Sequence, residues 1–284
     1  MANLKEIRNR IKSVKSIQQV TSAMKMVAGA KMRKAQERME QARPYAYRIR
    51  EVIQDLLPDV DRSVLKLLEV RPVQRVGIVV VTSDRGLAGS FNTNIIKRAH
   101  QEIESAGAEN VDLICIGKKG ADHFKRRDFK LIETHVEFWN ELDFTHAVKI
   151  GNGIISHFLN ENVDEIRVVF NEFKNVATQL IIVDKLLPLT FEAGTSKPRN
   201  RLYEPSREAI VKSLVPRHLN VQVWRYLLES FASEQAARMV AMENATDNAI
   251  EMTKSLQLLY NKARQNAITT EMLEIVSGAE ALKQ

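Results

Sequence analysis

Cysteine is almost absent from the 284-residue sequence: Cys115 is the only one, so no disulfide can form within the chain. Because Cys115 lies in an apolar run, we expect a buried thiol in a protein of a reducing compartment. The longest apolar stretches, such as 76–81, have the length of a strand and are far too short to span a membrane. Residues 1–8 lack the apolar segment of a signal peptide, and we expect neither a signal nor a transit peptide. Any membrane association is therefore expected to be indirect.

Glycine and proline are absent from residues 217–277, which predicts an uninterrupted helix. Within it, residues recur every seven positions in two mostly apolar series, one beginning at Trp224 and the other at Leu228. Two series of the same period run from Leu4 to Leu56. Such a period is typical of a coiled-coil seam. At 1.5 Å per residue these helices would reach roughly 80 to 90 Å, more than the diameter of a domain of this size. The two terminal helices are therefore expected to form a rod.

The middle of the chain, about 73–192, has a different pattern. Runs rich in β-branched residues predict strands at 73–82, 111–116, 129–136, 165–173 and 179–187, the last two as a hairpin. Helices are expected at 92–105, with Asn92 or Thr93 as N-cap, and at 118–127 and 144–159. Strands that alternate with helices indicate a Rossmann-like α/β domain with a mostly parallel sheet. Residues 58–72 and the loop 194–205 would join this domain to the two long helices.

An α/β domain inserted between two terminal helices predicts that the helices pair antiparallel. The expected organisation is an N-terminal coiled-coil helix (1–57), an α/β foot domain (73–192) and a C-terminal coiled-coil helix (208–284). If the helices leave the foot level with each other, Leu4 lies within a few residues of the position beside Tyr260, and about the last twenty residues project alone. Pro44 is expected to kink the first helix, and Pro216 to break the start of the second.

Acidic residues are missing between Arg8 and Gln36, and residues 1–57 hold 13 Lys and Arg against 5 Asp and Glu. This segment alone could account for the net charge of +7. A basic helix favours an acidic partner, which could be nucleic acid, anionic lipid or a carboxylate-rich protein. A solvated helix face that only aids solubility is the alternative.

The loop 82–92 follows a strand and precedes a helix, as phosphate-binding loops do. Its glycine spacing does not match a dinucleotide fingerprint, and no Gly-Lys-Ser/Thr follows. The segment from Gly117 to Gly120, after the second predicted strand, likewise matches neither phosphate-binding motif. We interpret the first loop as a conformationally demanding turn or a protein contact. An enzyme that binds a nucleotide on the α/β domain, and a coiled coil that binds nucleic acid, are the competing hypotheses.

No metal site is predicted, because the six histidines show no metal-ligand spacing. The sequence also shows no pattern that indicates a catalytic group or a cofactor site. Met24, Met26, Met32 and Met39 are expected to pack in or beside the seam. Arg238 and Asn266 occupy seam positions, where they either fix the register or face a partner. Beyond residue 264 no facing helix is expected, yet the sequence stays apolar at Ile268, Met272, Leu273, Ile275, Val276 and Leu282. Such side chains predict a covering partner.

Three long segments carry a family resemblance: residues 12–36, 234–249 and 260–279. Together with residues 82–89 they resemble the gamma subunit of bacterial-type F-type ATP synthases, along the whole chain. The resemblance implies the central rotor shaft, which is not itself catalytic. It would turn inside a ring of three alpha and three beta subunits, with its foot on the c-ring beside epsilon. It also implies a peripheral protein on the cytoplasmic face of the cell membrane, which touches the membrane only through the c-ring and binds no nucleic acid.

The resemblance also implies contacts with the catalytic head. Met24 and Lys25 would lie at the neck, facing an acidic segment of beta. Arg238, Arg264 and Gln265 match positions that contact beta loops. Residues Asp84, Arg85 and Gly86, in the loop that ends at Gly89, match a further contact, and 277–284 would sit in an apolar bearing. Chloroplast relatives carry an inserted cysteine segment that this chain lacks, so we expect no redox control by a disulfide.

Overall fold

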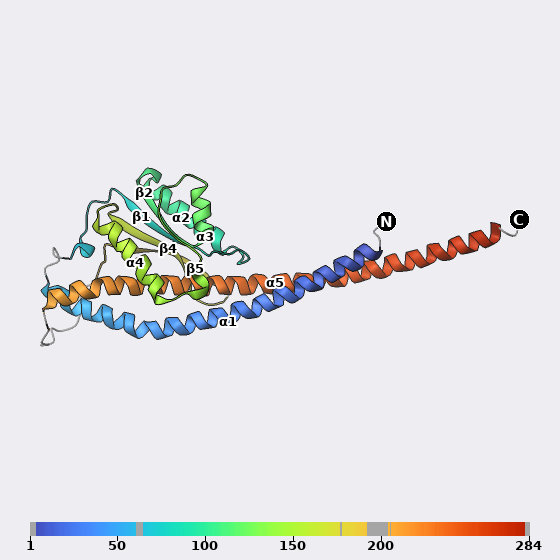
Figure 1. Ribbon diagram of the computed structural model, residues 1–284, viewed down its shortest axis with the longest axis horizontal. Coiled ribbons are helices and arrows are strands. Elements are labelled where there is room, and N and C mark those ends of the chain that lie inside the picture. The colour runs from blue at the N-terminus through green and yellow to red at the C-terminus, as the bar shows by residue number, and fades with distance from the viewer. Residues whose placement is uncertain (1–3, 61–64, 177, 192–203, 205, 282–284) are drawn as a thin grey trace. The chain divides into compact units, whose positions relative to one another are not determined.

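The computed structural model describes residues 4–60, 65–176, 178–191, 204 and 206–281 (Figure 1). Its contacts divide the chain into two compact units. Unit 1 consists of residues 1–27 and 239–284, and unit 2 of residues 28–238. The loop predicted at 194–205 lies outside the described residues, except for residue 204.

Two long helices begin and end the described chain, as the heptad pattern predicts. Helix α1 spans Leu4–Leu56 and passes through Pro44, and α5 spans Arg207–Ala281 and passes through Pro216. The predicted break at Pro216 is therefore wrong. Proline removes one helical hydrogen bond, but Val211, Val215 and Leu219 around it are at most 1% exposed. Burial of these three side chains, at about 1.5 to 3 kcal/mol each, offsets that loss.

The middle of the chain folds into a five-stranded sheet of order β3-β2-β1-β4-β5. The strands are β1 Val76–Val81, β2 Val111–Ile116, β3 Leu131–His135, β4 Glu165–Phe173 and β5 Gln179–Leu187. The first four are parallel, and β5 pairs antiparallel with β4, which confirms the predicted hairpin and mostly parallel sheet. Short 3₁₀ helices at Leu57–Asp59 and Lys66–Leu68 lie between α1 and β1.

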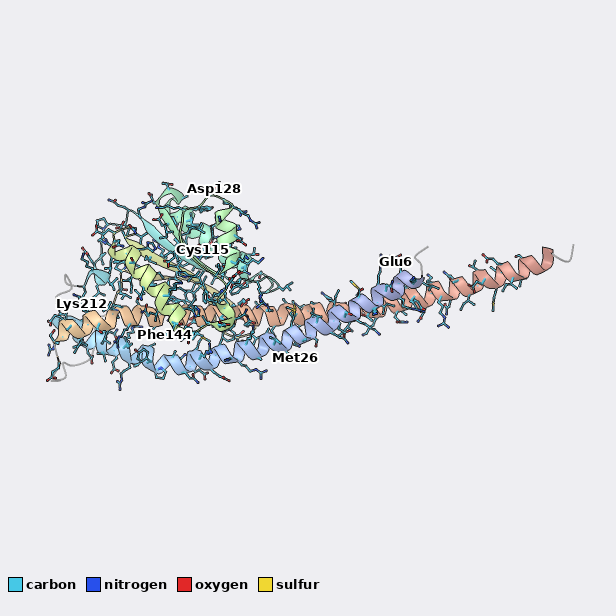
Figure 2. The ribbon with its side chains drawn as sticks, in the orientation of Figure 1. Glu6, Met26, Cys115, Asp128, Phe144 and Lys212 are labelled. Atoms are coloured by element: carbon cyan, nitrogen blue, oxygen red, sulfur yellow. The ribbon has the colours of Figure 1, made fainter. Side chains whose placement is uncertain are left out.

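Helices cover both faces of this sheet (Figure 1). Helices α2, Phe91–Ala106, and α3, Lys118–Lys125, pack on one face. Helix α4, Phe144–Leu159, packs on the other, together with the parts of α1 and α5 that belong to unit 2. The β1 side chains alternate between the two cores, so each face of the strand is buried. Cys115 lies inside this domain with no exposed surface (Figure 2), and burial raises the pKa of its thiol to about 12.

The start of α2 differs from the prediction. Ser90 is its N-cap, rather than Asn92 or Thr93, and makes no capping hydrogen bond. The Asn92 side chain instead accepts a hydrogen bond from the Ser83 backbone N–H at 3.0 Å. Asn92 therefore stabilises the preceding loop, which competes with capping for the same side-chain oxygen.

Within unit 1, α1 and α5 run antiparallel. Arg8 donates to the Tyr260 hydroxyl at 2.7 Å, and Thr21 and Thr246 share a hydrogen bond of 2.8 Å. Arg8 thus takes the place predicted for Leu4, a shift of one helical turn. The predicted register assumed that the two helices leave the foot at the same level.

Candidate functional site

The crevice where an open parallel sheet would bind a ligand is filled by α5. That crevice lies at the carboxyl ends of β1 and β4, where the strand order reverses. Ser230 and Phe231 of α5 enter it, and the Ser230 hydroxyl accepts from the Asn171 backbone N–H at 3.3 Å. The Phe231 ring stacks on Trp139 at 5.9 Å between centroids. The space left among these side chains does not admit a water molecule, so the nucleotide hypothesis loses its site.

The glycines after β2 serve close packing rather than phosphate binding. Gly117 has φ +94°, and a Cβ there would lie 2.1 Å from the Thr82 carbonyl oxygen. The Thr82 hydroxyl accepts from the Gly120 backbone N–H at 2.9 Å. These contacts join the loops after β1 and β2, and a side chain at Gly117 would separate them.

Asp84, a predicted contact residue, is used inside the domain. One carboxylate oxygen accepts from the Lys118 backbone N–H at 2.9 Å, and the other from the Glu137 backbone N–H at 2.8 Å. The residue therefore ties together the loops that follow β1, β2 and β3. Arg85 and Gly86, also predicted contacts, lie beside it, and both are exposed.

Arg238, predicted at a seam position, points into unit 2. Its guanidinium pairs with Glu234 at 2.5 Å and donates to the Gly86 carbonyl at 3.1 Å. Gln235 donates to the other Glu234 oxygen at 2.7 Å. Burial raises the pKa of Glu234, while Arg238 acts in the opposite direction. Arg238 and the loop at Gly86, which the resemblance implied as two separate contacts, thus touch each other.

The predicted neck residues Met24 and Lys25 lie on α1 in unit 1. Met24 is half-buried, and Lys25 forms a 2.6 Å ion pair with Glu243 of α5. Met32 is buried as predicted, but Met26 is 67% exposed, so its assignment to packing is wrong. Met26 lies beside other exposed apolar residues of α1, and the heptad period alone does not distinguish a seam edge from a surface.

The C-terminal part of α5 carries the predicted contacts Arg264 and Gln265, both with exposed side chains. Beyond them the apolar residues are also exposed: Ile268, Met272, Leu273, Ile275 and Val276 range from 43% to 71%. Leu282 and the end of the predicted bearing segment lie outside the described residues. Five exposed apolar side chains on one helix form a surface that a partner would cover.

Four of the six histidines meet in two clusters that their spacing does not reveal. The Nε2 atoms of His100 and His123 lie 2.9 Å apart, and His123 Nδ1 lies 3.1 Å from the Arg127 guanidinium. Because a guanidinium only donates, His123 carries its proton on Nε2 and donates it to His100. Burial, followed by the charge of Arg127, lowers the pKa of His123.

The second cluster joins β3 to α4. The Glu133 carboxylate lies 2.9 Å from His135 Nε2 and 3.4 Å from His157 Nε2. Burial lowers the pKa of His135, although Glu133 favours its charged form. Both clusters join residues of different elements, which explains why no sequence spacing indicates them. Among the residues that the structure describes, no group of three or more His, Cys, Asp or Glu could hold a metal ion.

Glu229 is a half-buried carboxylate on α5, beside a cavity of about 70 Å³ that α1 also lines. Its side chain is 15% exposed and lies 3.8 Å from the Arg225 guanidinium. Burial raises its pKa to about 7, although Arg225 favours the charged form. No sequence feature distinguishes Glu229 from the other carboxylates of α5.

Sequence comparisons support one family along the whole chain. A family model described as ATP synthase matches residues 3–282. Relatives named ATP synthase gamma chain include those of Prosthecochloris aestuarii, 50% identical, and Chloroherpeton thalassium, 48% identical. Each alignment covers 100% of this chain and 99% of the relative.

Solved structures show the same fold. A chain from the central stalk and c-ring of the Tetrahymena thermophila mitochondrial ATP synthase is 27% identical, with a TM-score of 0.63. The match covers 80% of this chain and 99% of that one. A chain of the Euglena gracilis mitochondrial ATP synthase shares the fold at 23% identity and a TM-score of 0.70, covering 98% and 94%. None of the helices in the described part of our chain is both long and apolar enough to cross a membrane.

Proposed function

The chain belongs to the ATP synthase family as a gamma chain, and from this premise we propose how its residues serve the central-stalk rotor. A gamma chain is a non-catalytic subunit of the F-type enzyme, so its role is mechanical. The observation that best supports this role is the antiparallel pairing of α1 and α5 in unit 1. Beyond that pairing, α5 continues to Ala281 with apolar side chains exposed.

We propose that the paired helices turn inside a ring of three alpha and three beta subunits. A single shaft cannot match a threefold ring at every point, so each beta subunit meets different side chains. A partner shifts a conformational equilibrium only by its differential contacts with the two states. Rotation would therefore exchange the open and closed states of the three sites in order. Proton flow through the c-ring would drive ATP formation, and ATP hydrolysis would drive the reverse.

The division of labour that we propose follows the predicted domains. Helices 1–57 and 208–284 would form the shaft, and the α/β foot, 73–192, would stand on the c-ring beside epsilon. The filled crevice of the foot favours a docking role over a ligand-binding one. The chain would be a peripheral protein on the cytoplasmic face of the cell membrane, in contact with the membrane only through the c-ring.

The predicted head contacts fall into two groups. Arg264 and Gln265 have exposed side chains available to beta loops. Met24 is partly exposed and Arg85 is exposed, so both can also contact a partner. Lys25 would interact both with Glu243 and with an acidic segment of beta. Asp84 and Arg238 are engaged inside unit 2. We propose that these two contribute to the head contact through the loop that they hold.

Co-purification tests the proposal. A tagged chain expressed with alpha, beta and epsilon should elute with three alpha and three beta subunits. Ile275→Asp places a charge on the exposed apolar end of α5 and should reduce that recovery. Glu274→Gln, at the neighbouring exposed position, is the matched control and should leave it unchanged. Elution of the wild-type chain without alpha and beta would contradict the proposal.

A further inference from the structure

Leu87 has an unfavourable backbone conformation that burial of its side chain does not offset. Its φ is +63°, in the left-handed region that is unfavourable for residues other than glycine. The side chain is 66% exposed, so burial does not compensate for the strain. A strained residue persists only where its surroundings determine the backbone. The contacts of this loop should therefore show what fixes it.

Two sets of contacts hold the loop from opposite sides. On the side of the sheet, the Ser83 hydroxyl donates to the Arg85 carbonyl at 2.6 Å, and Asp84 accepts from two backbone N–H groups. On the other side, the Arg238 guanidinium of α5 donates to the Gly86 carbonyl at 3.1 Å. The carbonyl that Arg238 binds directly precedes Leu87.

Arg238 depends in turn on Glu234, one helical turn earlier. Their ion pair is 2.5 Å long, and the two side chains are only 11% and 6% exposed. A guanidinium so deeply placed has few directions open to it, and the carboxylate selects the one that reaches Gly86. Charge-assisted pairs of this kind are short and directional. Gln235 also donates to Glu234 and fixes the carboxylate.

We propose that Glu234 is a positioning residue, which holds Arg238 against the Gly86 carbonyl and so attaches the loop tip, Arg85 to Leu87, to α5. The inference rests on the proposed function, in which this loop contacts the head. It follows that α5 and the loop move as one body. Torque on α5 is then transmitted directly to the contact between the loop and the head. Arg238 then acts on the head through Gly86 and not by its own side chain.

Amide hydrogen exchange on the full-length chain tests the attachment. Glu234→Gln keeps the shape and removes the charge, and Arg238→Ala removes the donor. Both should speed exchange at the hydrogen-bonded amides that hold this loop, Ser83, Lys118 and Glu137, by about fivefold, the factor that one lost hydrogen bond produces. The amides of β1 should stay protected, which separates local release from general destabilisation. Glu208→Gln, an exposed carboxylate on the same helix, is the control and should change nothing. Unchanged exchange at Ser83, Lys118 and Glu137 in both variants would overturn the inference.

Coupling in the assembled enzyme tests its consequence. In vesicles that carry the reconstituted complex, Glu234→Gln should lower the proton pumping obtained per ATP hydrolysed, and Glu234→Asp should restore part of it. Recovery of alpha and beta subunits with the variant should stay normal. If the wild-type chain fails to assemble, the proposed function fails. If the variant assembles and its pumping per ATP equals that of the wild type, only the positioning role of Glu234 is refuted.

Discussion

Helix α5 behaves differently in the two units. In unit 2, Leu219, Leu227 and Leu228 are at most 1% exposed, and their neighbours Val221 and Tyr226 are nearly as buried. In unit 1, Leu258 is 72% exposed and Leu259 is 50% exposed. A helix that is apolar on all sides belongs to a core, whereas one with a single buried stripe presents its other faces to partners. One continuous helix is thus part of a core in one unit and exposes apolar side chains in the other.

The same substitution at two leucines of α5 should give the largest contrast. Leu227→Ala empties a fully buried site and should lower the free energy of unfolding by about 2 to 5 kcal/mol. Leu258→Ala removes an exposed side chain and should change it by less than about 0.5 kcal/mol. Denaturant unfolding of the isolated chain measures both values. Equal losses at the two positions would show that the units do not differ as described.

Glu229→Gln should test the buried part of α5 in unit 2 through the pH dependence of folding stability. The folded pKa of about 7 lies above the ordinary 4.5, so the folded state holds the proton more tightly. Folding stability from this group is therefore present at about pH 4.5 and falls as the pH rises to about 7. Glutamine carries no charge, so the variant should exceed the wild type above pH 7 by at most about 3 kcal/mol.

At pH 4.5 the two proteins should be equally stable, and unfolding curves at both pH values test this. Glu208→Gln, at an exposed position of the same helix, should show no such dependence on pH. An advantage of Glu229→Gln that is the same at both pH values would point to packing and not to charge.

The smallest effect is expected at the ion pair of unit 1. Lys25 and Glu243 are 39% and 47% exposed, so solvent screens their attraction. Lys25→Ala should cost at most about 1 kcal/mol, and salt should reduce the cost further. A double-mutant cycle with Glu243→Ala measures the pair itself. We also predict that neither Lys25→Ala nor Arg264→Ala alone stops rotation in an assembled complex, which single-molecule rotation assays can check.

Most of the fold was predictable because it depends on periodic patterns. The seven-residue period predicts α1 and α5, and the β-branched runs predict all five strands within a few residues. The predicted break at Pro216 was wrong because the sequence does not show how deeply the side chains around a proline are buried. The observed register, with Arg8 rather than Leu4 beside Tyr260, differs from the predicted one by a single turn, because the ends of two helices fix their register only to within a few residues.

The candidate site was less predictable, because its contacts cross between elements. The family resemblance implied Asp84 and Arg238 as partner contacts, but nothing in the sequence showed that both hold the loop at Gly86. The paired histidines and the raised pKa of Glu229 depend on burial and on neighbours distant in the chain. A positive φ at Leu87 also has no sequence signal, since leucine is a poor choice for that conformation.

Cysteine labelling gives the most direct test of the central claim that other subunits cover the end of α5. Cys115 is fully buried and its pKa is raised to about 12, so a cysteine introduced as Ile275→Cys is the reactive thiol of the chain. We predict rapid labelling at position 275 in the free chain, where this side chain is 71% exposed, and strong protection once alpha and beta are bound. Equal labelling rates in the free chain and the complex would contradict the claim.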